Sequence, residues 1–205
     1  LQRIKQQEGP VLVLHDTTEL EYTTLKSLTR LGYIGNGHRR GYITHNSLAV
    51  DPETKDVIGL CNQVLHRRPK VPKSETRAQR NKRKSRESLL WIKGTDPLPA
   101  DRQIVDVCDR GADTSEFIEH EINSGRRFVI RSSHDRCILI GHGAPEESES
   151  CKLKQYASTL EQAGTWTLQV TSKSEMKSRK RKGKKKLVRR IKREANMAVA
   201  FAPVQ

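Results

Sequence analysis

The sequence lacks cysteines in Cys-x-x-Cys pairs, and it lacks an apolar run long enough to cross a bilayer. Its four cysteines are Cys61, Cys108, Cys137 and Cys151. Their wide spacing argues against a zinc knuckle, and Cys108 fits a small core residue. No basic and apolar signal segment opens the chain, and nothing requires disulfides. The expected location is therefore a reducing cytosol.

Acidic residues are scarce in two segments, which leaves the charge unevenly placed. The formal net charge is +15. Residues 67–86 hold ten Lys or Arg and one acid, and residues 177–193 hold twelve Lys or Arg and no acid. The rest of the chain has a net charge of −6. One such run alone would fit a solvated loop equally well, but two favour binding to a polyanion, of which nucleic acid is the simplest. Neither run has the apolar face of a membrane-binding helix.

The composition suits one globular domain with a sizeable insertion. The chain has 205 residues, of which 34% are hydrophobic and 31% charged. Up to about residue 134, apolar runs and helical patterns alternate, which predicts an α/β core over 10–134. From residue 135, short apolar runs separated by polar turns predict a β-rich subdomain over 135–205.

Within the core, β-favouring runs predict strands at 10–16, 41–50, 56–66, 103–109 and 128–130. The turn chemistry of residues 51–55 makes 41–66 a hairpin. Helices are predicted from about Glu75 to Ile92 and over 113–123. The second would bury Phe117, Ile118 and Ile122 and end at a cap on Gly125. Residues 1–9 have no apolar anchor, and 19–31 fit a helix weakly.

Several glycines gather in residues 32–41, next to basic side chains. A glycine-rich loop can cradle phosphates, but this spacing does not give the GxxxxGK[ST] pattern. Nucleotide binding by such a loop is therefore not favoured.

Two acids follow apolar strands of the same design. Val11–Leu14 leads through His15 to Asp16, and Ile104–Cys108 leads to Asp109, 93 residues further on. Acids at the ends of neighbouring strands can hold Mg²⁺ jointly, because Mg²⁺ takes carboxylate oxygens and retains waters. Such metals activate a nucleophile and stabilise the leaving oxygen in phosphodiester chemistry.

Other polar residues near these acids are given lesser parts. The hydroxyls of Thr17 and Thr18 can bond the Asp16 carboxylate or cap the following segment. Asp113, one helical turn beyond Asp109, either caps its own helix or supports the site.

An acid after a strand is often only a turn residue or a helix cap. Asp106 precedes Asp109 by three positions, so strand alternation points it to the opposite face and sets it aside. A haloacid-dehalogenase phosphotransferase would need an acid at position 18, where this chain has Thr18. Two strand-linked acids together with two basic runs favour the catalytic interpretation.

The segments Leu14–Leu20 (Leu-His-Asp-Thr-Thr-Glu-Leu) and Val107–Asp113 (Val-Cys-Asp-Arg-Gly-Ala-Asp) resemble the two acidic motifs of bacterial insertion-sequence transposases. The group meant is the Asp-Asp-Glu (DDE) cut-and-paste group that carries a β-strand insertion domain. Glu87–Trp91 and Phe128–Ser132 also fit that group. The resemblance is clear from about residue 10 to 134 and looser beyond.

The resemblance implies a ribonuclease H-like core, a mixed sheet with the hairpin 41–66 on one side and helices on its faces. It implies that Asp16 and Asp109 coordinate Mg²⁺, for which Mn²⁺ can substitute, in cleavage of transposon ends and strand transfer to target DNA. It also implies a homodimer acting on double-stranded DNA in the bacterial cytoplasm, at the nucleoid, with no membrane partner.

Basic residues are the DNA contacts that the resemblance implies. Arg110 and Arg131 would contact phosphates next to the site. The two basic runs would supply further contacts, from Lys82, Arg83, Lys84, Lys180, Arg181, Lys182, Lys184, Lys185 and Lys186.

Two features of the family are not found. Its third acid, a Glu on a later helix, has no counterpart, since no acid follows Glu194. Its N-terminal end-recognition domain is also missing, and the chain opens on Leu1, so a fragment inactive in transposition is expected. Two alternatives stay open: a non-catalytic DNA-binding remnant, and a ribonuclease H-like nuclease or resolvase.

Overall fold

The computed structural model describes residues 2–72, 74–101, 103–140, 149–171, 173–178 and 185–202, with the backbone alone at 173–178 and 185–190. The chain divides into two compact units, Leu1–His134 and Asp135–Gln205. No described helix combines the length and apolar content that a membrane crossing requires.

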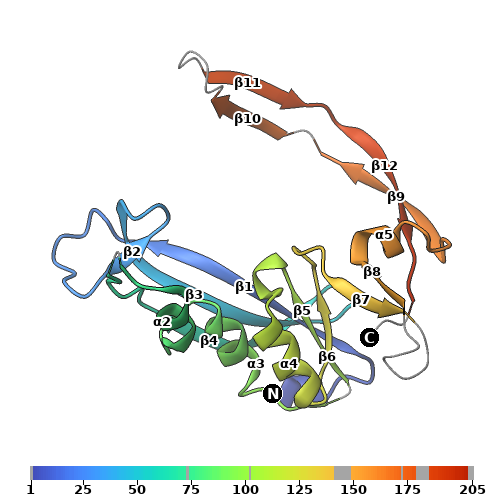
Figure 1. The fold of residues 1–205 in the computed structure, drawn as a ribbon, viewed down its shortest axis with the longest axis horizontal. Helices are drawn as coiled ribbons and strands as arrows, with labels where there is room; N and C mark the ends of the chain where they lie inside the picture. Colours follow the sequence, from blue (N-terminus) through green and yellow to red (C-terminus); the bar gives the residue numbers. More distant parts are fainter. Residues whose placement is uncertain are drawn as a thin grey trace. The chain divides into compact units, whose positions relative to one another are not determined.

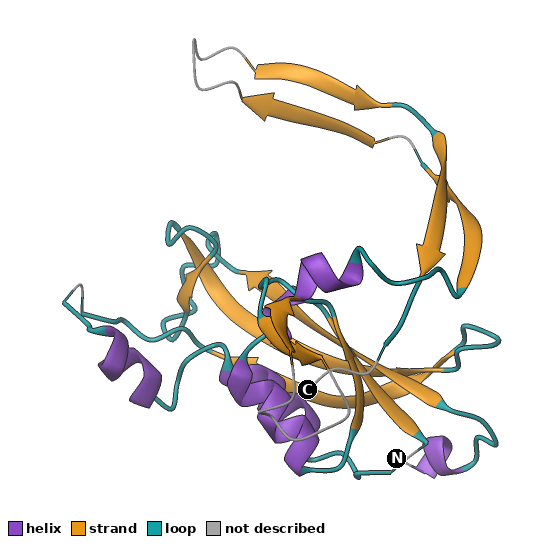
Figure 2. Ribbon diagram, turned by 45° about the vertical axis from the view of Figure 1, so that its right-hand side comes forward, coloured by secondary structure: helices purple, strands orange, loops and turns teal. Residues whose placement is uncertain are grey.

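A six-stranded sheet forms the centre of the first unit (Figure 1). Its strands are β1 Val11–Glu21, β2 Gly32–Ile34, β3 Arg39–Val50, β4 Val57–His66, β5 Ile104–Cys108 and β6 Arg127–Ile130. The order is β2–β3–β1–β5–β6, and β4 also pairs with β3. Strand β3 is antiparallel to β1, β2 and β4, whereas β1, β5 and β6 run parallel. The sheet is therefore mixed, and Figure 2 shows that it is curled. The predicted α/β class is confirmed.

Strand alternation gives this sheet one buried face and one more open face. Val11 and Val13 of β1 are fully buried, whereas Leu14, which points to the other face, is 37% exposed. In the parallel partner β5, Ile104 lies in register with Val11 and is also buried. Val129 of β6, on the open face, is 59% exposed.

Two helices cover the buried face, α3 Leu89–Thr95 and α4 Ser115–Asn123, and Figure 1 shows them side by side. Trp91 of α3 and Phe117 of α4 pack together with Cys108 and Ala112. The ring centroids of Trp91 and Phe117 are 6.2 Å apart. Replacing a buried aromatic of this kind by Ala typically costs about 3–5 kcal/mol. This cluster fixes both helices to the end of β5.

Helix α4 ends at the predicted glycine. Gly125 has a φ of 65°, its N–H bonds Ile122 O at 3.0 Å, and the N–H of Arg126 bonds Glu121 O at 3.0 Å. This is a Schellman ending, which favours glycine because of its positive φ. The turn directs Arg126 back towards the sheet.

The predicted hairpin is present as β3 and β4. In its turn the Asp51 carboxylate accepts hydrogen bonds from the N–H groups of Glu53 at 2.8 Å and Thr54 at 3.2 Å. An aspartate side chain that bonds the backbone two residues on is the chemistry expected of such a turn.

Four local predictions are wrong. Strand β1 continues to Glu21 and does not stop near residue 16, and residues 22–31 form turns in place of a weak helix. The helix expected over 75–92 is two helices, α2 Arg77–Lys82 and α3. Helix α2 begins at a capping box formed by Thr76 and Gln79, contains no buried residue and is followed by Arg83 with an extended backbone. The short helix α1 Gln2–Lys5 is anchored after all, through the buried Ile4.

The second unit consists mainly of paired strands. Strand β7 Cys137–Ile140 pairs with β8 Glu149–Lys152, which the short helix α5 Leu153–Ala157 follows. The remaining antiparallel pairs are β9 Gly164–Val170 with β12 Arg193–Val199, and β10 Lys173–Ser178 with β11 Lys185–Arg190. These pairs are nested in sequence, and the basic run 177–193 includes the whole of β11.

The close packing of α3 on β3 gives a test of the fold. A Cβ at Gly94 would lie 2.4 Å from His45 Nε2 and 2.6 Å from His45 Cδ2. Helix propensity alone would make Gly94→Ala stabilising by about 1 kcal/mol. We expect the clash to prevail and to lower the free energy of unfolding by about 1–3 kcal/mol, measured by urea denaturation with circular dichroism. Gly9→Ala, with no atom within 4 Å of the new Cβ, is the control. Greater stability of Gly94→Ala than of the parent chain would contradict the packing described.

Candidate functional site

The last fully paired row of the parallel strands crosses β1, β5 and β6. It consists of His15, Cys108 and Ile130, which are in register with one another. The next residue along each strand is an exposed charged one, namely Asp16, Asp109 and Arg131.

This arrangement brings the two predicted acids to adjacent strands. The N–H of Arg131 donates to Cys108 O at 3.1 Å, so β6 stays beside β5 at this point. Asp109 has an extended backbone, with φ −79° and ψ −171°. Side-chain alternation therefore continues one residue past β5, and Asp109 lies on the open face of the sheet, as Asp16 does. The two carboxylates and the guanidinium of Arg131 follow one row.

The backbone of Asp16 lies inside a paired strand and not at a strand end. The expectation that β1 stops at Asp16 is wrong, because the strand continues for five more residues. Asp16 is instead in register with Asn46 of β3. Only the pairing with β5 ends here, so the Asp16 backbone is fixed by β3 while its other side faces Asp109.

Asp109 is both a candidate ligand and a cap. Its Oδ1 accepts a hydrogen bond from Gly111 N at 2.7 Å and so begins the 3₁₀ turn η1 Arg110–Ala112. A Cβ at Gly111 would lie 2.8 Å from Cζ2 of Trp91. Glycine is therefore needed for the turn to lie against the Trp91 ring, and this contact fixes where the Asp109 carboxylate stands.

The two threonines after Asp16 do not behave as predicted. Thr17 Oγ1 lies 3.2 Å from His45 Nδ1, so its hydroxyl is directed to the buried face, away from the Asp16 carboxylate. No helix follows for either threonine to cap. Thr18 is exposed and lies on the same face as Asp16, two residues further along the strand.

Asp113 neither caps α4 nor contributes to the row of acids. The cap of α4 is Thr114, whose hydroxyl accepts from Phe117 N at 3.3 Å. Asp113 is buried, and its Oδ2 accepts from Ser133 N at 2.6 Å and His134 N at 2.9 Å. Asp113 thus fixes the segment that follows β6, including the backbone next to Arg131.

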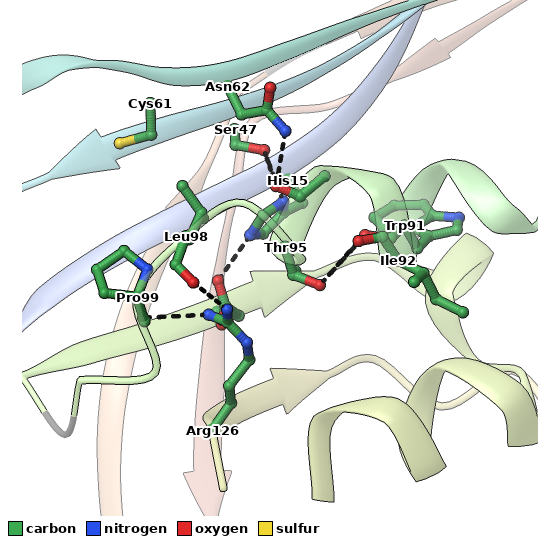
Figure 3. A network of polar contacts seen from close by, with 12 residues as sticks. His15, Ser47, Cys61, Asn62, Trp91, Ile92, Thr95, Leu98, Pro99 and Arg126 are labelled. Atoms are coloured by element: carbon green, nitrogen blue, oxygen red, sulfur yellow. Dashed lines mark hydrogen bonds and ion pairs between the residues drawn. The ribbon is translucent and has the colours of Figure 1, made fainter. Parts of the chain in front are cut away.

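A network of buried polar side chains joins β1, β3 and β5 on the buried face of the sheet (Figure 3). His15 Nε2 is 2.8 Å from Asp106 Oδ1, and His15 Nδ1 is 3.0 Å from Ser47 Oγ. Ser47 Oγ also contacts Gly94 O of α3 at 3.2 Å. The guanidinium of Arg126 reaches Asp106 Oδ2 at 3.6 Å. Strand alternation predicts that Asp106 points away from the site of Asp16 and Asp109. It is 1% exposed, and its contacts join β1, β5 and the residues after α4.

His45 extends this network towards the helices. Its ring stacks on His15 with centroids 5.7 Å apart and meets Trp91 edge-on at 4.8 Å. Burial, and secondarily the nearby His15, lower the pKa of His45 to about 4. The ring is therefore neutral at neutral pH and holds Thr17 by a hydrogen bond.

Glu121 is a buried acid that we did not anticipate from the sequence. The prediction that Ile122 faces the core is wrong, since Ile122 is 61% exposed and Glu121 is fully buried beside Phe117. Burial, and secondarily the charge of Asp106, raise the pKa of Glu121 to about 7. The signal was present: Glu121 lies four residues after Phe117 and so shares its helical face.

The predicted DNA contacts fall into three groups. Arg110, Arg131, Lys82 and Lys84 are exposed. Arg83 instead donates from Nε to Glu75 Oε1 at 2.9 Å, with only 26% of its side chain exposed. In the second run, Lys185 and Lys186 begin β11, whereas the predicted contacts Lys180, Arg181, Lys182 and Lys184 lie outside the described residues.

The donor set of the row suits a hard divalent cation. Within the described residues, no cluster of three or more His, Cys, Asp or Glu side chains is arranged to hold a metal. Asp16 and Asp109 are two carboxylates on adjacent strands, both exposed to water. Mg²⁺ is commonly bound by one or two carboxylates and completes its shell with water, so these two residues fit it.

The raised pKa of Glu121 gives a pH test of the network. Because the folded chain holds this proton up to about pH 7, against an ordinary pKa of 4.5, the stabilisation is complete below pH 4.5 and is lost as the pH rises through 7. Glu121→Gln should remove this pH dependence, which is on the order of 2–3 kcal/mol. Urea denaturation at several pH values between 4.5 and 8 measures it.

The exposed Glu119→Gln on the same helix is the control and should keep the parent pH dependence. If Glu121→Gln also kept it, Glu121 would not be the buried proton-binding group described above.

Comparison with protein families assigns nothing further, because no family model matches the chain. The functional interpretation therefore depends on the row of Asp16, Asp109 and Arg131, on the network beneath it and on the exposed basic residues.

Proposed function

We propose that this chain is part of a transposase catalytic domain, of the kind that binds double-stranded DNA and carries out metal-dependent phosphodiester cleavage and strand transfer. The observation that carries the proposal is the row of Asp16, Asp109 and Arg131 on adjacent strand ends. It joins two carboxylates of the kind that Mg²⁺ takes with a cation suited to a phosphate.

A ribonuclease H-like fold is part of the same proposal. Its support is the mixed sheet, in which the hairpin β3–β4 lies on one side of β1 and the parallel strands β5 and β6 on the other. Helices α3 and α4 cover one face, and the acids lie on the opposite face.

In the proposed mechanism Asp16 and Asp109 are the residues that would hold Mg²⁺ or Mn²⁺. When bound, the metal would lower the pKa of a water and neutralise charge on the scissile phosphate. The chain's own residues position these acids: β3 holds Asp16, and the Asp109–Gly111 turn against Trp91 holds Asp109. Arg131 and Arg110 bind the DNA phosphates that flank the reacting bond, by charge-assisted hydrogen bonds.

Among the described residues of the first unit, no third acid joins this row. Glu194, the last acid of the sequence, lies in β12 of the second unit and accepts a hydrogen bond from Gln169 Nε2 at 2.5 Å. We therefore propose that residues 1–205 bind metal and DNA but do not complete strand transfer by themselves.

One observation favours the alternative of a non-catalytic DNA-binding remnant. The Asp109 carboxylate already serves as a cap for Gly111 N, which is a sufficient structural reason for an acid there. A nuclease or resolvase with the same core would use the same two acids. A measurement of metal binding therefore distinguishes the non-catalytic remnant from the two enzyme hypotheses, the transposase and the nuclease or resolvase.

The first test is metal binding by the full chain. Mn²⁺ titration followed by electron paramagnetic resonance should detect a site that Asp16→Asn and Asp109→Asn each weaken by at least tenfold, because each removes one of two carboxylate ligands. Asp56→Asn, in an exposed turn, is the matched control and should bind as the parent does. Equal Mn²⁺ binding by the parent and both row variants would leave the remnant as the better account.

The second test separates phosphate-binding arginines from structural ones. Arg131→Ala should weaken duplex DNA binding and lower the slope of log K against log [salt] by about 0.9, since one phosphate contact is lost. Arg83→Ala should leave that slope unchanged and instead lower stability, by up to about 1 kcal/mol for a partly exposed ion pair. Fluorescence anisotropy at several salt concentrations and urea denaturation measure both quantities. A change of slope in Arg83→Ala but not in Arg131→Ala would reverse the assignment.

A further inference from the structure

A pocket of about 450 Å³ lies between β2 and the start of the first basic run. Tyr33, Pro69 and Val71 give it apolar walls, and Arg68 and Lys70 give it cationic ones. Its lining also includes Glu87 and Arg83, each of which is held in an ion pair. Neither the row of acids nor the network beneath it includes these residues. The pocket therefore needs an explanation of its own.

Close backbone packing fixes one wall of the pocket. A Cβ at Gly32 would lie 2.9 Å from Arg68 N and 3.0 Å from Arg68 O, so only glycine lets the basic run lie this close to β2. The Arg68 guanidinium donates to both carboxylate oxygens of Glu87, at 2.5 and 3.0 Å, and to Gly35 O at 3.3 Å.

Each member of the ion pair stabilises the charged form of the other. The hydrogen bonds from Arg68 lower the pKa of the Glu87 carboxyl, and those to Glu87 raise the pKa of Arg68. Two parallel N–H···O bonds of this kind also restrict the orientation of both side chains. The Arg68 wall is therefore formed before any ligand arrives.

Tyr33 supplies an aromatic surface that the fold does not use. Its side chain belongs to a short strand at the sheet edge and is 42% exposed. Arg40 is its register partner on β3, and such partners share a face of the sheet. Arg40 and Lys70 are both exposed, and neither forms an ion pair with an acid among the described residues. The exposed ring thus has one cation, Arg40, as its cross-strand partner and another, Lys70, in the lining of the same pocket.

We propose that this pocket holds one unpaired nucleotide of a DNA strand, with its base stacked on Tyr33 and its flanking phosphates neutralised by Lys70 and Arg40. Single-stranded nucleic acid is commonly bound by a positively charged surface that tracks the backbone and by aromatic rings on which bases stack. The apolar walls and the ring match the base, and the cations match the phosphates. The inference deepens the proposed function, because it takes DNA as the partner.

The two parts of the pocket should leave different signatures on binding. Stacking of a base on an aromatic ring is worth roughly 5- to 150-fold in affinity and carries no charge, so its loss does not alter the salt dependence. A lysine that contacts a phosphate contributes about 0.7 to the salt slope on a single strand. Tyr33→Ala and Lys70→Ala therefore probe separate terms.

The experiment compares two fluorescent strands of equal length in anisotropy titrations with residues 1–205. One is an oligo-thymidine, and the other is the abasic sugar–phosphate chain. The parent chain should prefer the oligo-thymidine by about fivefold or more, and Tyr33→Ala should lose that preference while binding the abasic strand normally. Tyr33→Phe should keep the preference because the ring remains. Lys70→Ala should weaken binding to both strands and lower the salt slope.

Because Tyr33 is exposed, we expect its variants to fold as the parent chain does. Circular dichroism and urea denaturation check this, since a misfolded variant would differ from the parent chain in both. An equal preference for the oligo-thymidine in the parent and Tyr33→Ala would overturn the proposal. So would an equal loss on both strands, which would indicate a structural role for Tyr33. Neither outcome affects the metal site, which the Mn²⁺ titration of Asp16 and Asp109 variants tests separately.

Discussion

The parallel register of β1 against β5, and of β5 against β6, is the constraint on which the site depends. It aligns His15, Cys108 and Ile130, so that the next residue of each strand enters one row. Side chains alternate with a period of two, so a slip of one residue would move Asp16 to the buried face and His15 to the open one. The apolar residues Val11 and Val13 oppose such a slip, because it would expose both of them. Core burial therefore fixes the relative position of two acids that lie 93 residues apart in the sequence.

The buried face adds a second layer of control. His15, the residue before Asp16, contacts Asp106, the residue three positions before Asp109. The network thus links the two strands directly beneath the row, and Arg126 ties it to the end of α4. Burial of such charges lowers stability unless each charge has a partner. We infer that these pairs also favour a single arrangement of the strands over alternatives. Near Asp106, burial and secondarily the charge of Asp106 raise the pKa of Glu121 to about 7, so this buried acid keeps its proton below that pH.

The features that sequence reasoning predicted depend on local periodicity. The hairpin over 41–66, the strand before Asp109, the cap at Gly125 and the opposite orientation of Asp106 follow from spacing and turn chemistry. The errors come from tertiary contacts. Strand β1 passes residue 16 because β3 pairs with it as far as Glu21, and threonine-rich segments give no signal for where pairing ends. Arg83 looks like any other basic residue of its run, and only the fold brings Glu75 to it. The helical spacing of Glu121 from Phe117 predicts that the two residues share a face. The prediction for this helix assigned only apolar residues to the buried face and therefore missed Glu121.

The proposed activity and the proposed nucleotide pocket use different parts of one sheet. The first needs two carboxylates held at a fixed separation, and the second needs a ring and cations at the β2 edge. The central claim is that the register makes Asp16 and Asp109 a shared metal site. Anomalous diffraction from crystals of this chain soaked in Mn²⁺ tests it most directly. We expect an anomalous peak within bonding distance of carboxylate oxygens of both Asp16 and Asp109. No peak there, or Mn²⁺ bound only at other acids while these two carboxylates point apart, would contradict the account.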